Sequence, residues 1–258
     1  MSLRESFLVA LRLVTKYPQL FVPKLAVALA YGWLLLQTAG VISAIADASG
    51  LFSIPDGQLA ASLFSRTLVL FVLALGAFVF DVWVSAWYPA LVAQYRANET
   101  VSFRKAMALA GNRFWTVLPL FLGMELAISV IVGLVASVGF VFLSPPLSFV
   151  VMGLVLVALF VFSVVVYPLL PVGVLENQSA SGSISRSLAL SRLNWKSFSV
   201  AALLPFAISL ANLAVAFFSD QLQFWLLFWA VRLLLVLVVT YNAVVNPAVY
   251  FSVVEPRA

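Results

Sequence analysis

The sequence predicts an all-α integral membrane protein with a single transmembrane domain over residues 1–258, and three observations support this fold class. Hydrophobic residues make up 64% of the chain and charged residues only 9%, with a mean hydropathy of +1.15. One water-soluble core of this chain length cannot bury so much apolar surface. Long apolar stretches recur along the chain, and the segments that flank them resemble one another.

Six apolar stretches are long enough to cross a bilayer, whose hydrocarbon core of about 30 Å needs roughly 20 helical residues. They cover residues 19–45, 66–95, 116–143, 147–175, 198–218 and 223–253. Each run is continuously apolar, whereas a strand of a membrane barrel alternates in polarity over about ten residues. A helix also satisfies its own backbone hydrogen bonds in hydrocarbon. We therefore expect six transmembrane helices.

Lys and Arg gather on one side of this six-span arrangement. Arg66 lies near the opposite side and Arg232 falls within the last span. Loops rich in Lys and Arg stay in the cytoplasm, so we expect both termini to be cytoplasmic. The other twelve of the fourteen basic residues lie on that side: Arg4, Arg12, Lys16, Lys24, Arg96, Arg104, Lys105, Arg113, Arg186, Arg192, Lys196 and Arg257.

Internal repetition is the strongest pattern in the chain. The segments WYPALVAQYRANE, VYPLLPVGVLENQ and VNPAVYFSVVEPR align around Pro89, Pro168 and Pro247, which are 79 residues apart. Three units of two spans each share one orientation in the membrane, which is typical of parallel repeats around an axis along the membrane normal. We predict three tandem two-helix repeats, over residues 1–98, 99–178 and 179–258.

A short polar segment precedes the first span of each repeat. These segments align on Ala10, Ala108 and Ala189, and their polar residues fall on one side of a helix. We expect an interfacial amphipathic helix in each repeat. Its cations either bind anionic lipid headgroups, at about 1 kcal/mol each, or merely obey the orientation rule. This candidate lipid-headgroup collar comprises Arg4, Arg12, Lys16, Arg104, Lys105, Arg113, Arg186, Arg192 and Lys196.

The three repeated prolines predict helix kinks. Pro89, Pro168 and Pro247 each lack the backbone N–H that a helix interior needs, so each should bend its helix near the cytoplasmic end. Such a kink either opens a vestibule or helps long helices to pack.

Three charged residues lie well inside the predicted spans, away from the span ends: Asp81, Glu125 and Arg232. A charge at the centre of a span costs about 2.5 to 3.5 kcal/mol, so it needs a partner or water. Counted by the 79-residue spacing, the residues equivalent to Asp81 in the other two repeats are Phe160 and Val239, so the charge does not recur there. The three residues form a candidate intramembrane charge site. They make an internal ion pair, most simply Arg232 with Asp81 or Glu125, or a ligand or proton site, or they sit shallower than the span boundaries suggest.

Residue usage excludes much familiar enzymology. The chain has no Cys and no His, which removes thiol nucleophiles, thiolate and imidazole metal ligands and Ser–His triads. No phosphate-binding glycine loop, metal cluster or nucleophile–base set is present in the sequence, so we expect no cofactor, no metal and no catalysis. The net charge of +5 does not indicate nucleic-acid binding, because the cations flank apolar spans.

The stretch VLENQSASGSISRSLALSRLNWKSF, residues 174–198, resembles a segment in the membrane domain of bacterial glycerophosphodiester phosphodiesterases. It is also similar to uncharacterised six-helix prokaryotic membrane proteins, including the YciC-like group. Echoes occur at residues 99–115 and 3–17. The resemblance implies a membrane module of the cytoplasmic (inner) membrane, without the phosphodiesterase barrel and its catalytic residues. The matching positions are Glu176, Ser187, Leu188, Leu190, Asn194 and Trp195.

Three functional classes remain. The sequence favours a non-enzymatic membrane module that interacts with membrane lipids, through anionic headgroups, or with membrane-protein partners. The alternative is a small-solute or lipid transporter or channel that uses Asp81, Glu125 and Arg232. An intramembrane enzyme has only Asp81 and Glu125 to offer.

Overall fold

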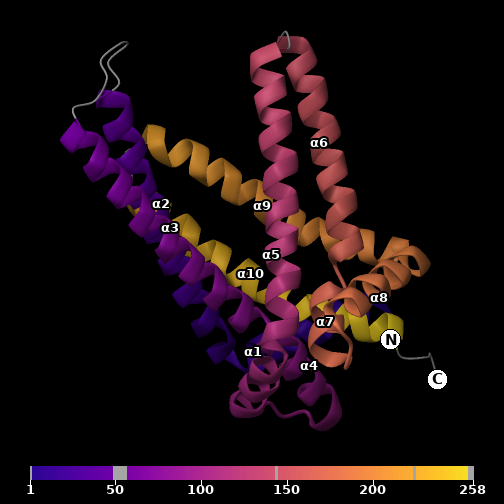
Figure 1. Ribbon diagram of the computed structural model, residues 1–258. Helices are drawn as coiled ribbons and strands as arrows, with labels where there is room; N and C mark the ends of the chain where they lie inside the picture. The colour runs from indigo at the N-terminus through magenta and orange to yellow at the C-terminus, as the bar shows by residue number, and fades with distance from the viewer. Residues whose placement is uncertain (1, 49–56, 143–144, 223–224, 255–258) are drawn as a thin grey trace. The chain divides into compact units, whose positions relative to one another are not determined.

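The computed structural model describes residues 2–48, 57–142, 145–222 and 225–254. Every regular element in these ranges is helical, as Figure 1 shows. The all-α prediction is therefore confirmed for the part of the chain that is described. The elements are α1 (Leu3–Lys16), η1 (Pro18–Leu20), α2 (Phe21–Ala48), α3 (Gly57–Ser85), α4 (Trp87–Asn98), α5 (Phe103–Phe142), α6 (Pro145–Val166), α7 (Leu169–Leu175), α8 (Ala180–Leu193), α9 (Trp195–Leu222) and α10 (Trp225–Val254).

Five of these helical segments are long and apolar enough to cross a membrane. A sixth exists if α8 and the first part of α9, bent by 109° at their junction, are counted as one span. The predicted spans other than 198–218 each overlap one of the five. The predicted span 198–218 passes the length and hydropathy test only together with α8, so the count among the described residues is five or six. The five segments are Pro18–Val41, Ala61–Asn98, Phe103–Val130, Val150–Leu175 and Phe228–Val254.

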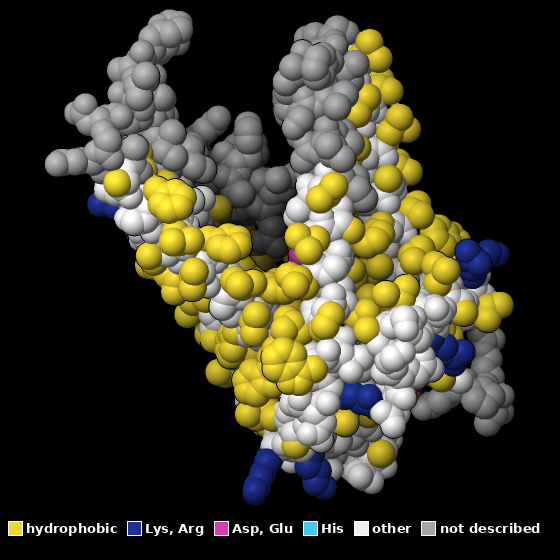
Figure 2. All heavy atoms as spheres, viewed as in Figure 1, with side chains coloured by type: hydrophobic (Ala, Val, Ile, Leu, Met, Phe, Trp, Pro, Cys, Tyr) yellow, Lys and Arg dark blue, Asp and Glu magenta, His cyan; other side chains and the backbone are white. Residues whose placement is uncertain are grey.

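Large apolar side chains cover the outer faces of these helices. Phe64 and Phe71 of α3 are 71% and 65% exposed, and Leu154 of α6 is 65% exposed. Figure 2 shows such side chains along α5 and α6, with Lys and Arg around α4, α7 and α8 at their lower end. Water disfavours this much exposed apolar surface, whereas hydrocarbon accepts it. The molecule is therefore built as a membrane-embedded helical protein.

The chain divides into two compact units. Unit 1 contains residues 1–17, 82–208 and 241–258, and unit 2 contains residues 18–81 and 209–240. Helices α3, α9 and α10 each contribute residues to both units. In unit 1, α4, α5, α7 and α8 pack together, and α6 runs beside α5 and packs against α8 (Figure 1).

The segments around the repeated prolines form the core of unit 1. Tyr88 is 1% exposed, Val172 is fully buried and Ala248 is fully buried. The same holds for most of their neighbours in each segment. The motif that the sequence repeats therefore lies at the best-packed part of the unit, where prolines and small residues let short helices approach one another closely.

Side chains satisfy the backbone carbonyls that prolines free in this core. Pro168 cannot donate to the carbonyl of Val164, and the buried Ser191 hydroxyl donates to that oxygen at 3.2 Å and to the Val165 oxygen at 3.0 Å. Pro171 likewise frees the carbonyl of Tyr167, which accepts a 2.7 Å hydrogen bond from the Asn246 side chain. These hydrogen bonds tie α8 and α10 to the break between α6 and α7.

The predicted kinks take two forms. Helix α3 ends at Ser85, and Pro89 lies in the first turn of the following helix α4, while Pro168 caps α7 after the end of α6. Pro247 lies inside the continuous helix α10. Two of the three prolines therefore accompany a break between helices, and the third is accommodated within one helix.

A serine directly precedes the start of three helices in unit 1. The small residues four and eight positions after each serine are buried. Burial therefore matches Ala10 with Ala110 and Ser187, whereas Ala108 and Ala189 are exposed, which corrects the sequence alignment by two residues. The threefold repeat itself stays a prediction. The serines are Ser2, Ser102 and Ser179, and their carbonyls accept helical hydrogen bonds of 2.9 to 3.1 Å from Ser6, Ala106 and Ser183.

The polar segments of the three repeats differ in form. Helix α1 is separate and begins with a capping box, in which Ser2 and Glu5 bond each other reciprocally; the Ser2 backbone and side-chain bonds lower the pKa of the Glu5 carboxyl. Helix α8 is also separate. The expected short helix of the second repeat is instead the first part of the 40-residue helix α5, because no break follows residue 103.

Ser191→Ala is expected to lower the free energy of unfolding by about 1 to 3 kcal/mol, because the carbonyl freed by Pro168 then lies buried without a donor. Thermal unfolding of the purified protein in detergent measures the change. Ser185→Ala, on the exposed side of the same helix α8, is the matched control. Equal stability of the two variants would show that Ser191 does not hold the helix break together.

Candidate functional site

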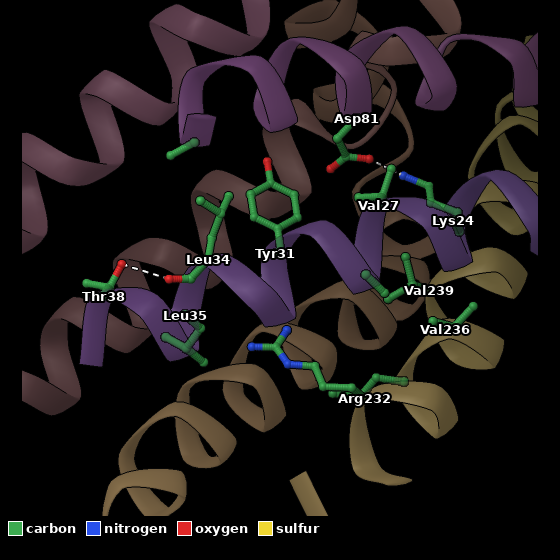
Figure 3. A pocket seen from close by; sticks show the side chains of 13 residues that line it. Lys24, Val27, Tyr31, Leu34, Leu35, Thr38, Asp81, Arg232, Val236 and Val239 are labelled. Atoms are coloured by element: carbon green, nitrogen blue, oxygen red, sulfur yellow. Dashed lines mark hydrogen bonds and ion pairs between the residues drawn. The ribbon is translucent and has the colours of Figure 1, made fainter. Parts of the chain in front are cut away.

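Asp81 binds Lys24 in unit 2. The Lys24 ammonium lies 2.6 Å from Asp81 Oδ1, with the two side chains 7% and 32% exposed. Lys24 belongs to α2 and Asp81 to α3, and Figure 3 shows the two side chains pointing toward each other. The pair lowers the energetic cost of placing a carboxylate in an apolar span, because each charge compensates the other.

Local sequence places Lys24 in the first turn of α2. Pro23 stands just before it, where the missing N–H of a proline costs the helix nothing. Further along α2, Gly32 contacts the Trp229 ring of α10, and a Cβ at this glycine would lie 2.8 Å from the ring. The glycine therefore lets α10 approach α2 closely and sets the position of the residues that follow Trp229.

Arg232 lies one turn after Trp229 on α10. Its guanidinium is 5.5 Å from the centroid of the Phe228 ring, a cation–π contact with a residue on the same face of the helix. Figure 3 shows the guanidinium directed from α10 toward α2, on the side of α2 that carries Leu35. Arg232 therefore faces the space between the two helices.

These charged residues line a cavity of about 460 Å³ in unit 2, which we call the charged cavity. Its lining carries two cations and one carboxylate, so its net charge is +1. Aliphatic side chains make up most of the remaining wall, joined by Tyr31 and Thr38. The charged cavity is lined by Lys24, Val27, Ala28, Tyr31, Leu34, Leu35, Thr38, Ala74, Asp81, Arg232, Leu235, Val236 and Val239.

Two further cavities lie along α2 and α3. One of about 300 Å³, which we call the apolar cavity, shares three lining residues with the charged cavity and has no charged residue in its wall. The other, of about 410 Å³, includes Arg66, Ser65 and Gln37. All three of these cavities therefore have residues of both α2 and α3 in their walls. The apolar cavity is lined by Leu34, Thr38, Val41, Thr67, Leu70, Phe71 and Ala74.

The structure brings together two of the three charged residues selected from the sequence. Asp81 and Arg232 line the same cavity, while Glu125 lies on α5 in unit 1 with an exposed side chain. Lys24 is the cation that the structure places in contact with Asp81, a contact that the sequence did not predict. Asp81 lies four residues before the end of α3, near the middle of the candidate span Ala61–Asn98 that α3 and α4 form together.

The sequence does contain a signal for Lys24. The residue falls inside the first predicted span, 19–45, although its charge also fits the count of cations on the cytoplasmic side. A lysine followed by an apolar run and an acid in the neighbouring span indicates an intramembrane pair as readily as a boundary. An intramembrane pair differs from a boundary cation in whether Lys24 on α2 faces the acid on α3, and only the structure shows this.

The candidate collar lies entirely in unit 1, and most of its cations are exposed. Three members bind protein groups: Lys16 donates to the Glu99 carbonyl at 3.1 Å, Arg186 forms a 3.3 Å ion pair with Glu176, and Arg113 donates to the Asn177 side chain. Lys24 is not part of this set. The other six are exposed on the surface: Arg4, Arg12, Arg104, Lys105, Arg192 and Lys196.

The chemistry available in the charged cavity is that of binding. Lys and Arg donors attract and hydrogen-bond an anion, Tyr31 and Thr38 add hydroxyls, and the aliphatic wall accepts apolar groups. No group of three or more acidic residues that could hold a metal ion occurs among the described residues.

No family model, curated protein or solved structure matches the chain. The resemblance of residues 174–198 to other membrane modules stays an expectation, and the function must be argued from the geometry.

Asp81→Asn is expected to lower the free energy of unfolding by about 3 kcal/mol, because the buried Lys24 loses the carboxylate that it binds. The double variant Lys24→Met, Asp81→Leu removes both charges and should recover most of this loss. Thermal unfolding in detergent compares the three proteins. If Asp81→Asn is as stable as the wild type, the pair does not stabilise unit 2.

Proposed function

We propose that this protein is a non-enzymatic membrane module that binds an anionic membrane lipid in the charged cavity. One observation carries the proposal: the cavity combines a net charge of +1 with a mostly aliphatic wall, inside a unit whose outer surface is apolar. A ligand that matches both properties has an anionic group and a hydrocarbon part.

Electrostatics favours an anion over a cation or a neutral lipid in this site. Coulomb attraction is stronger away from bulk water, so the Arg232 guanidinium and the Lys24 ammonium act over a longer range than on a wetted surface. Asp81 holds Lys24 in place, and Arg232 adds a second cation to the lining, whose charged side chains sum to +1. A zwitterionic lipid offers no net charge for these cations to attract.

The candidate collar supports the same function from unit 1. Exposed leucines stand beside its cations: Leu8 and Leu11 near Arg12 on α1, and Leu193 next to Arg192 at the end of α8. Apolar side chains next to Lys and Arg on a short helix are typical of elements that lie in the headgroup region. Each cation near an anionic surface adds about 1 kcal/mol of attraction.

Transport is the second candidate function. Charged residues that line a cavity within a span are a feature of substrate pathways. Vesicles containing fluorescent phosphatidylglycerol distinguish the two functions, since a transporter moves the lipid between leaflets and a binding module does not. Lipid movement that Arg232→Gln abolishes would assign the site to transport.

Arg232→Gln is expected to lower the amount of anionic lipid that stays with the purified protein by about tenfold, a loss of about 1.4 kcal/mol in binding free energy. The guanidinium supplies both the charge and the directed donors of the cavity. The measurement uses protein exchanged into detergent with equal amounts of phosphatidylcholine and phosphatidylglycerol, washed, and analysed by mass spectrometry of the retained lipid.

Arg66→Gln is the matched control, because Arg66 is an exposed cation that lines a different cavity in the same unit. It should leave the ratio of the two lipids unchanged. Equal loss in both variants would indicate a general charge effect, and no loss in Arg232→Gln would contradict anion binding in the charged cavity.

A further inference from the structure

We propose that the ligand of the charged cavity is a single-chain amphiphile with one anionic group, and that its chain lies in the adjoining apolar cavity between α2 and α3. This inference rests on the proposed function and specifies the class of ligand. A fatty acid is the simplest molecule of that class.

The two cavities are continuous in their walls. Leu34, Thr38 and Ala74 line both of them, so the two cavities adjoin at these three side chains. Beyond these shared residues the two walls differ in charge. The charged cavity presents three charged side chains, whereas the apolar cavity presents none.

The lining changes from charged to uncharged along the length of α2, which suits a lipid with an anionic group and a hydrocarbon chain. Lys24 lies in the first turn of α2, and Thr38 stands fourteen residues further along the same helix, from position 24 to position 38. This corresponds to about 21 Å at 1.5 Å per residue, compared with a hydrocarbon core of about 30 Å. An anionic group on the Lys24 side of the charged cavity therefore places a chain of ordinary length along the span, past Arg232.

The size of the apolar cavity favours one chain. Its volume of about 300 Å³ is at the lower end of the range of roughly 300 to 1,000 Å³ found for small-molecule sites. The cavity also opens to the lipid-facing surface, because Phe71, Thr67 and Thr38 are exposed. A chain can thus enter the apolar cavity sideways from the bilayer. A second chain of the same lipid would stay outside this cavity, so only a single-chain ligand is enclosed completely.

Selectivity must come from shape and charge together. A chain that moves from bilayer to cavity exchanges one hydrocarbon environment for another, so the hydrophobic effect contributes little. Close packing in the apolar cavity and attraction at the anionic group remain as driving forces. The contribution of the chain to the binding free energy is therefore sensitive to added bulk in the apolar cavity. The contribution of the anionic group is sensitive to Arg232.

Ala74 offers the sharpest test, because it lines the junction of the two cavities. The full-length protein in detergent is incubated with equal amounts of palmitate and dioleoylphosphatidylglycerol, washed on an affinity resin, and its retained ligands are quantified by mass spectrometry. The wild type should retain palmitate in preference to the two-chain lipid. Ala74→Phe should lower palmitate retention by about fivefold or more, because the ring fills the junction.

Leu75→Phe is the matched control, because it places the same ring on the neighbouring residue, which is 45% exposed and lines neither cavity. It should retain palmitate like the wild type. Thr67→Phe fills the apolar cavity from its exposed side and should repeat the effect of Ala74→Phe. Thermal unfolding and gel filtration show which of the two cavity-filling variants is folded, and only a folded variant is compared with the wild type.

Three results would overturn the inference: equal palmitate retention by the wild type and a folded cavity-filling variant, preferential retention of phosphatidylglycerol by the wild type, or equal losses in Ala74→Phe and Leu75→Phe. Failure of the proposed function gives a different result, namely that Arg232→Gln retains as much of both anions as the wild type. Loss in Arg232→Gln without loss in Ala74→Phe keeps the anion site and removes the chain site.

Discussion

A polar group in hydrocarbon has no water to bind, and this constraint governs the whole structure. Every carbonyl that loses its helical donor and every charge inside a span needs a partner from the protein. The molecule meets the constraint differently in its two units. Unit 1 satisfies backbone oxygens with neutral side chains, as Ser191 and Asn246 do beside the prolines of α6 and α7. Unit 2 satisfies charges with an ion pair next to a cavity.

The two solutions have different consequences for packing. In unit 1 a hydroxyl or amide reaches a carbonyl only when helices are close, so the proline segments become the most buried part of the unit. In unit 2 the long side chain of Lys24 reaches from α2 to Asp81 on α3, and space remains along the two helices. The closely packed proline segments belong to unit 1 and the cavities along α2 and α3 belong to unit 2, so the two properties lie in different units.

Much of the fold follows from the sequence because hydrocarbon leaves few alternatives. Continuous apolar runs predict helices, and five of the six predicted spans match helical segments that pass the same test alone. A separate short helix before the span 198–218 was predicted, but its angle of 109° to α9 was not, nor were the hydrogen bonds of Ser187 and Ser191 to the carbonyls of α6. Some charged residues of the candidate site could be predicted from the sequence, and one could not. Asp81 and Arg232 were identified by their cost in a span, but the role of Lys24 depends on which helices face each other, and apolar periodicity does not encode that choice.

The asymmetry of the charges bears on why the cavity exists. Counted by the 79-residue spacing, Phe160 occupies the position of Asp81, and it packs edge-on against Phe206 with ring centroids 5.4 Å apart. The same type of position therefore accepts an ordinary aromatic contact in unit 1, so the scaffold does not need a carboxylate there. Replacing buried ion pairs by apolar residues is often neutral or stabilising in proteins. A pair beside a cavity, with Arg232 directed into the same space, thus fits the proposed binding of a ligand better than a role in packing the helices.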